Sequence, residues 1–137
     1  MDSLNPTRLE WKCGDTFLYR RQGFDQHLQI ILSDPSLNGD KVVIVNFSEL
    51  KPYKEQNCIV EIGEHPYITK RSCVPYRFAS IMPLALLEDR ESRGFIERQQ
   101  PLSKELRDKV LSGAALSPFM EVDIWDIIEN QGLVVPF

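Results

Sequence analysis

Residues 41–49, KVVIVNFSE, form the clearest predicted strand in this sequence, and the predicted fold is built around it. The segment opens with an almost unbroken β-branched run, which is typical of a strand buried on both faces. The preceding segment, HLQIILSDP at 27–35, predicts a second strand that ends at Pro35, because a proline nitrogen cannot donate to a ladder. Asn38 and Gly39 tolerate positive φ angles, so we expect the two strands to form an antiparallel hairpin.

Three further segments around this hairpin have strand character, at residues 16–21, 57–63 and 72–82. In the last of these, Pro75 requires an edge position, a bulge or an irregular start. Short strands at this spacing, with turn residues between them, are typical of a small antiparallel barrel.

The pattern becomes helical after Met82. We expect helices at 84–94, at 104–113 between an N-cap at Ser103 and a stop at Gly113, and at 119–132. The last segment carries apolar residues at helical spacing, namely Phe119, Val122, Trp125 and Ile128. The fold class is therefore α+β, a single domain over 1–137 with a barrel core at 14–82 and a helical C-terminal extension at 83–137.

Composition restricts the function further. The net charge of −4, from 16 basic and 20 acidic residues, does not indicate general electrostatic capture of nucleic acid. No run approaches the ~18 apolar residues of a membrane span, and the first residues lack an apolar signal core, so we expect a cytoplasmic protein without a membrane partner. The odd cysteine count predicts reduced thiols in the core, at Cys13, Cys58 and Cys73.

The two histidines are the main candidates for chemistry. Counting outward from the predicted hairpin turn places His27 near the same end as Ser48, while His65 lies in the loop after the fourth predicted strand. Two imidazoles at one groove could accept and donate protons near neutral pH, as the cleavage of RNA without a metal ion requires. The alternative is structural: His65 caps a turn before Pro66, and His27 hydrogen-bonds a strand end.

Cations and aromatic rings alternate after His65. Lys70, Arg71 or Arg77 could stabilise a phosphorane, and Tyr67 and Tyr76 could stack on unpaired bases. Aromatic residues also fill cores, and we expect Phe78 to be buried and Tyr67 to be exposed. No nucleotide-binding or zinc-protease motif is present, so neither a cofactor nor a metal site is predicted.

The segment GDTFLYRRQGFDQHLQIILSDP followed by VVIVNFSE resembles the PemK/MazF-like toxins of bacterial toxin–antitoxin systems. The resemblance covers roughly residues 14–48. It implies a small antiparallel SH3-like β-barrel followed by C-terminal helices, a homodimer, an antitoxin partner and cleavage of single-stranded RNA without metal. The family's arginine and proline fall at His27 and Leu28, and its Thr-Ser pair falls at Phe47 and Ser48, so the chain departs from the family at the catalytic positions.

The sequence also resembles a set of small bacterial proteins with a G-(D/E)-H-P-(F/Y)-I segment, here GEHPYI at 63–68, which adds no activity. The first hypothesis is therefore a MazF-like endoribonuclease with His27, Ser48 and His65 as catalytic residues and Lys70, Arg71, Tyr67, Tyr76 and Arg77 as substrate-binding residues. The alternative is a non-catalytic SH3-like module that binds a protein or a nucleic acid. A third possibility is a structural protein that assembles through the apolar stripe of residues 119–128.

Overall fold

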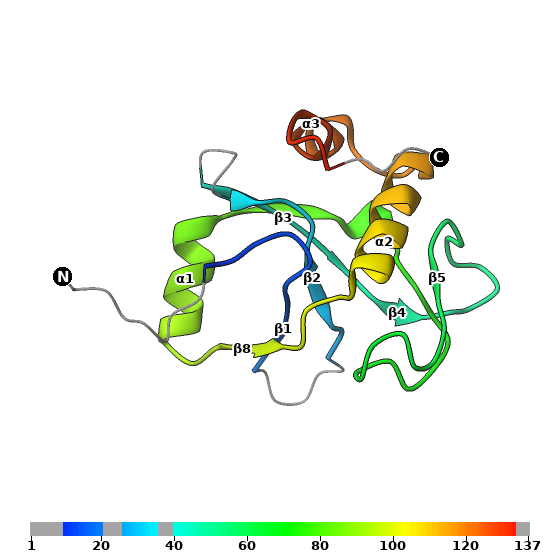
Figure 1. Ribbon diagram of the computed structural model, residues 1–137, viewed down its shortest axis with the longest axis horizontal. Helices are drawn as coiled ribbons and strands as arrows, with labels where there is room; N and C mark the ends of the chain where they lie inside the picture. Colours follow the sequence, from blue (N-terminus) through cyan, green and yellow to red (C-terminus); the bar gives the residue numbers. More distant parts are fainter. Residues whose placement is uncertain (1–9, 21–25, 36–39, 134–137) are drawn as a thin grey trace.

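The computed structural model describes residues 10–20, 26–35 and 40–133 of the chain (Figure 1). Its larger sheet has five strands, all paired antiparallel, in the order β7–β3–β2–β1–β8. These strands are β1 (Thr16–Tyr19), β2 (Gln29–Ile31), β3 (Lys41–Asn46), β7 (Ser80–Pro83) and β8 (Ile96–Gln99). The expected antiparallel pairing of residues 27–35 with residues 41–49 is confirmed, whereas Asn38 and Gly39 lie outside the described residues.

A second, smaller sheet has three strands in the order β4–β6–β5. They are β4 (Ser48–Glu49), β5 (Ile59–Val60) and β6 (Ser72–Cys73). Only Phe47 separates β3 from β4, so the ribbon 41–49 leaves the large sheet and enters the small one. The described strands thus form two sheets and not the closed barrel that strand spacing predicted.

The large sheet is covered on both faces, as the apolar run in β3 predicts. Alternate residues of β3 enter two different cores, with Val43 in one and Val42 in the other. The first core contains Leu106 and Ile128 from the two C-terminal helices, and the second contains Leu87 from the first helix. Figure 1 accordingly shows α1 well apart from α2 and α3.

The three predicted helices are present as α1 (Leu84–Ser92), α2 (Lys104–Leu116) and α3 (Val122–Asn130). Ser103 is the N-cap of α2, where its hydroxyl oxygen accepts a hydrogen bond from the Leu106 amide at 3.1 Å. The prediction that Gly113 ends this helix is wrong, because α2 continues to Leu116. Gly113 is instead a contact residue, since any side chain there would meet Tyr76 and Cys58.

Two parts of the sequence differ from the predicted elements. Residues 72–82 form not one strand but β6, the 3₁₀ turn η2 (Tyr76–Phe78) and most of β7, because Pro75 interrupts the ladder. Residues 96–99 form β8, which pairs with β1 over four positions although no strand was expected there. Residues 83–137 are therefore not purely helical.

The apolar stripe predicted for the last helix does not act as one surface. Ile128 is fully buried and Trp125 partly so, whereas Phe119 precedes α3 and Val122 is 71% exposed. The three cysteines are buried and free, as expected. In the part of the chain that the structure describes, no helix has the length and apolar character needed to cross a membrane.

Candidate functional site

The pairing of β2 with β3 brings His27 and Ser48 together. Gln29 lies opposite Asn46, and the amide of Phe47 donates to the carbonyl oxygen of Leu28 at 3.1 Å. One further step in this register places His27 beside Ser48, which confirms that the two residues lie at the same end of the hairpin. Both residues line the same two hollows in the surface, so together they form a ridge between them.

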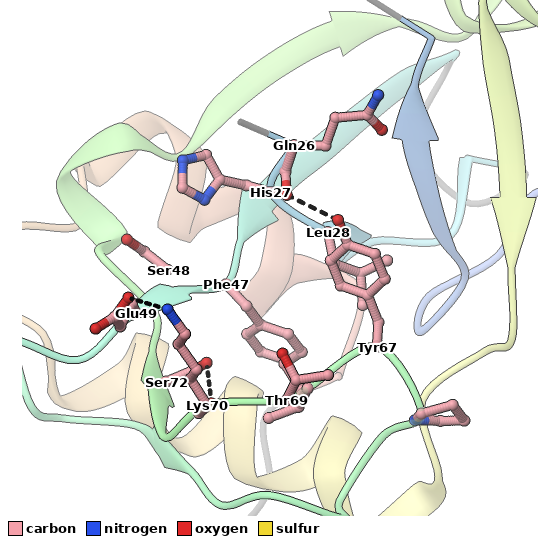
Figure 2. A pocket seen from close by; sticks show the side chains of 12 residues that line it. Gln26, His27, Leu28, Phe47, Ser48, Glu49, Tyr67, Thr69, Lys70 and Ser72 are labelled. Atoms are coloured by element: carbon pink, nitrogen blue, oxygen red, sulfur yellow. Dashed lines mark hydrogen bonds and ion pairs between the residues drawn. The ribbon is translucent and has the colours of Figure 1, made fainter. Parts of the chain in front are cut away.

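The first hollow, here called the Tyr67 hollow, has a volume of about 600 Å³. Figure 2 shows Phe47 between Tyr67 and Lys70, with His27 and Ser48 on the side away from Tyr67. The Tyr67 hydroxyl donates to the carbonyl oxygen of Gln26 at 2.9 Å, which fixes this wall (Figure 2). The other lining residues are Gln26, Leu28, Glu49, Pro66, Ile68, Thr69 and Ser72.

The second hollow, here called the Phe78 hollow, lies on the other side of the ridge and has a volume of about 520 Å³. Its walls come from β2, β3, the loop after β4, η2 and the segment between α2 and α3. Beyond His27 and Ser48, the lining residues are Gln29, Asn46, Tyr53, Lys54, Glu55, Pro75, Arg77, Phe78 and Phe119.

Lys54 is a site residue that the sequence did not indicate. Its ammonium group donates to the hydroxyl oxygen of Ser48 at 2.6 Å and to the carbonyl oxygen of Glu49 at 2.8 Å. Because Lys54 occupies a lone pair of the Ser48 oxygen, the hydroxyl proton of Ser48 remains available to an incoming acceptor. A lysine in a polar loop carries no pattern that singles it out, and only the closure of the loop after β4 reveals the contact.

His65 does not join the ridge. Its side chain is buried, with Nε2 2.6 Å from the carbonyl oxygen of Gln100, and Nδ1 accepts a hydrogen bond from the Tyr67 amide at 3.0 Å. These bonds require the tautomer in which Nε2 carries the proton, and they use both nitrogens. His65 thus holds the loop that presents Tyr67, which is the structural alternative considered for it. The structure does not support an acid–base pair made from His27 and His65.

The remaining predicted site residues lie in three different places: in the hollows, on the surface outside them, and in the core. Tyr67 and Lys70 line the Tyr67 hollow and Arg77 lines the Phe78 hollow, whereas Arg71 lines neither and pairs with Glu61 at 3.0 Å. The assignment of Tyr76 as a substrate-binding residue is wrong, because its ring is buried and its hydroxyl donates to the carbonyl oxygen of Val110 at 2.6 Å. Phe78 was expected in the core and is instead exposed, since η2 turns it outward.

Among the residues that the structure describes, three cations and two carboxylates line the two hollows, and both carboxylates have hydrogen-bond partners. Glu49 pairs with Lys51 at 2.9 Å and with Lys70 at 3.4 Å, and the hydrogen bond from Lys51 lowers the pKa of Glu49. Glu55 accepts hydrogen bonds from the Tyr76 amide at 3.2 Å and from the Asn57 side chain at 2.6 Å. The charge of Glu49 is thus compensated by its lysines, whereas the donors to Glu55 are neutral and leave its charge in the Phe78 hollow. The two cations of that hollow, Lys54 and Arg77, outnumber this one carboxylate.

No family model matches the chain, and no curated protein is similar to it. Among the residues that the structure describes, no cluster of three or more His, Cys, Asp or Glu side chains is arranged to hold a metal ion.

Proposed function

We propose that this protein is an endoribonuclease that cleaves single-stranded RNA with side chains alone, and that His27, Ser48 and Lys54 form its reactive centre. The observation that carries the proposal is the ridge itself. An exposed imidazole lies beside a serine hydroxyl whose oxygen accepts a hydrogen bond from an ammonium group, between two hollows of about 600 and 520 Å³. This revises the first hypothesis in two ways: His65 has no part in the reaction, and Lys54 joins the reactive centre in the charge-stabilising role first given to Lys70, Arg71 or Arg77.

Each of these residues has a role that fits its position. His27 accepts the proton of the ribose 2′-hydroxyl, whose oxygen then attacks the adjacent phosphorus. The Ser48 hydroxyl and the Lys54 ammonium group stabilise the added negative charge on the phosphorane. The bond to the 5′ oxygen breaks, solvent in the open groove protonates that oxygen, and a 2′,3′-cyclic phosphate remains on the other fragment.

The resemblance to PemK/MazF-like toxins adds further parts to the proposal. A relation to SH3-like barrels is supported by the ribbon 41–49, which belongs to both sheets. Pairing with a second copy or with an antitoxin is supported by apolar side chains exposed near α3, among them Leu116 and Val122.

A second candidate function has its own observation. Of the two histidines, only His27 lies on the ridge between the hollows. A single imidazole beside aromatic and cationic side chains also suits a protein that binds a strand without cutting it. In this alternative His27 and Tyr67 recognise the ligand, and the Lys54–Ser48 hydrogen bond only shapes the ridge.

The test is an RNA cleavage assay in excess chelator, with end-labelled single-stranded RNA and the intact protein. We expect fragments with 2′,3′-cyclic phosphate ends, and we expect His27→Ala and Lys54→Gln to lower the rate by about 100-fold or more. Lys41→Gln is the matched control, because Lys41, at the other end of β3, is an exposed cation that lines neither hollow. Strand binding without fragments favours the second candidate, and cleavage unaffected by His27→Ala contradicts the mechanism.

A further inference from the structure

Among the described residues, three solvent-exposed aromatic rings line the Phe78 hollow. Tyr53 is 83% exposed, Phe78 64% and Phe119 53%, and all three line this hollow although they come from separate segments of the chain. Large apolar side chains gathered at one concave site are informative, because isolated exposed ones are ordinary but a shared site indicates a ligand.

Two cations stand among these rings. The Arg77 guanidinium carbon lies 5.1 Å from the centre of the Phe78 ring, so the two side chains form a cation–π contact. Lys54 approaches from the ridge, where it already contacts Ser48. With Glu55 as the one carboxylate in the same lining, the described residues give the hollow an excess of positive charge beside flat apolar surfaces. An aromatic ring that carries a phosphate fits this combination.

Two side-chain amides complete the wall. Gln29 and Asn46 are direct partners in the β2–β3 register, and each is oriented by a hydrogen bond from its amide nitrogen to a backbone carbonyl. Gln29 donates to His27 at 3.1 Å and Asn46 donates to Phe47 at 3.3 Å. Asparagine and glutamine amides are the neutral side chains that pair with the hydrogen-bonding edges of nucleobases.

We propose that the Phe78 hollow binds one unstacked nucleobase of a single-stranded RNA, with the phosphate of that nucleotide against Lys54 and Arg77. The volume of about 520 Å³ is in the range of small-molecule sites. This inference rests on the proposed function, because the hollow shares His27 and Ser48 with the ridge and the bound base is therefore the one next to the reacting phosphate. Gln29 and Asn46 select among bases, while the three rings supply affinity for any base.

The experiment measures strand binding without cleavage. A fluorescent seven-nucleotide strand with 2′-deoxyribose at every position is titrated with the intact protein, and each base is replaced in turn by an abasic residue. We expect one position whose abasic replacement weakens binding to the native protein by about 10-fold or more. The same replacement should weaken binding to Phe78→Ala by clearly less than it weakens binding to the native protein, because that variant has already lost one of the stacking partners of the base.

Phe95→Ala is the matched control, since Phe95 is 52% exposed but lines neither hollow, and it should bind as the native protein does. The inference is overturned if the strand does not bind, if no single position behaves in this way, or if Phe78→Ala and Phe95→Ala are equivalent. Position-specific binding by a protein that cuts no RNA would refute the proposed cleavage and retain the base site. Cleavage without position-specific binding would refute the base site and retain the enzyme.

Discussion

Gly113 of α2 lies directly against the hydroxyl group of Tyr76 in η2. A Cβ atom on Gly113 would overlap with that oxygen and would lie 2.9 Å from the Cβ of Cys58. The same hydroxyl donates to the Val110 carbonyl oxygen one turn earlier in α2. The helix and the 3₁₀ turn are thus joined by this hydrogen bond, and the absence of a side chain on Gly113 leaves room for the hydroxyl group. This contact holds the turn that presents Arg77 and Phe78 to solvent.

Gly113→Ala should therefore destabilise the protein, although alanine is the better helix former by ~1 kcal/mol. The overlap with buried neighbours is expected to outweigh that gain, for a net loss of ~1–2 kcal/mol in the free energy of unfolding. Urea denaturation measures the effect. Ser112→Ala, one residue earlier in the same helix, is the control, and a stabilised Gly113→Ala would contradict the contact.

Tyr76→Phe should lower the free energy of unfolding by ~0.5–1.5 kcal/mol, because it removes the buried hydrogen bond from the Tyr76 hydroxyl to the Val110 carbonyl oxygen. Combined with Gly113→Ala, it should cost less than the sum of the two single changes, since removal of the hydroxyl makes room for the alanine methyl. Denaturation of the single and double variants gives the coupling. Exact additivity would mean that the two residues do not meet.

His65→Ala should reduce stability while His27→Ala does not. Replacing the buried imidazole of His65 leaves the Tyr67 amide without its acceptor and removes one of the two donors to the Gln100 carbonyl oxygen, the other being the Thr16 hydroxyl, for an expected loss of ~1–3 kcal/mol. His27 is exposed, and its loss should change the free energy of unfolding by less than ~0.5 kcal/mol. Denaturation midpoints compare the two variants, and equal effects would contradict the assignment of one histidine to structure and the other to the ridge.

Stability should fall as the pH rises above about 9. Burial raises the pKa of Cys13 from 9.0 to about 12 and that of Cys58 to about 11, so the unfolded chain loses thiol protons that the folded chain keeps. In that window the unfolded state binds fewer protons, and each such thiol lowers the free energy of unfolding by up to ~1.4 kcal/mol per pH unit. Denaturation at pH 8, 9 and 10 measures the slope. Cys13→Ala should flatten it, and an unchanged slope would show that Cys13 ionises as freely in the folded protein.

We expect the protein to form a homodimer that Val122→Asp dissociates. Val122 is the first residue of α3 and is exposed. The charge of an aspartate there should leave the fold intact while it disrupts an apolar interface. Light scattering should show twice the 15.8 kDa chain mass for the native protein and the single mass for the variant. Ile62→Asp, which also alters an exposed side chain, is the control. A monomeric native protein would contradict the expectation.

Much of this architecture follows from local pattern. The pairing of residues 27–35 with residues 41–49, the burial of β3 on both faces and the Ser103 cap depend on neighbouring residues, and the sequence predicts them. β8 was missed because IERQ alternates poorly and becomes a strand only where β1 offers an edge. The same limit applies at the site: the register predicts the meeting of His27 and Ser48, whereas Lys54 and the burial of His65 depend on how loops close.

The segment 41–49 also affects how cooperatively the molecule unfolds. A chain built from two sheets often has a seam where one half can open while the other stays closed. Here one continuous segment supplies the inner strand β3 to the large sheet and the edge strand β4 to the small one, so the two ladders are joined through adjacent residues. Because the loss of one ladder should destabilise the other, we expect unfolding to be a two-state transition. The geometry of the ridge is then retained until the whole chain unfolds.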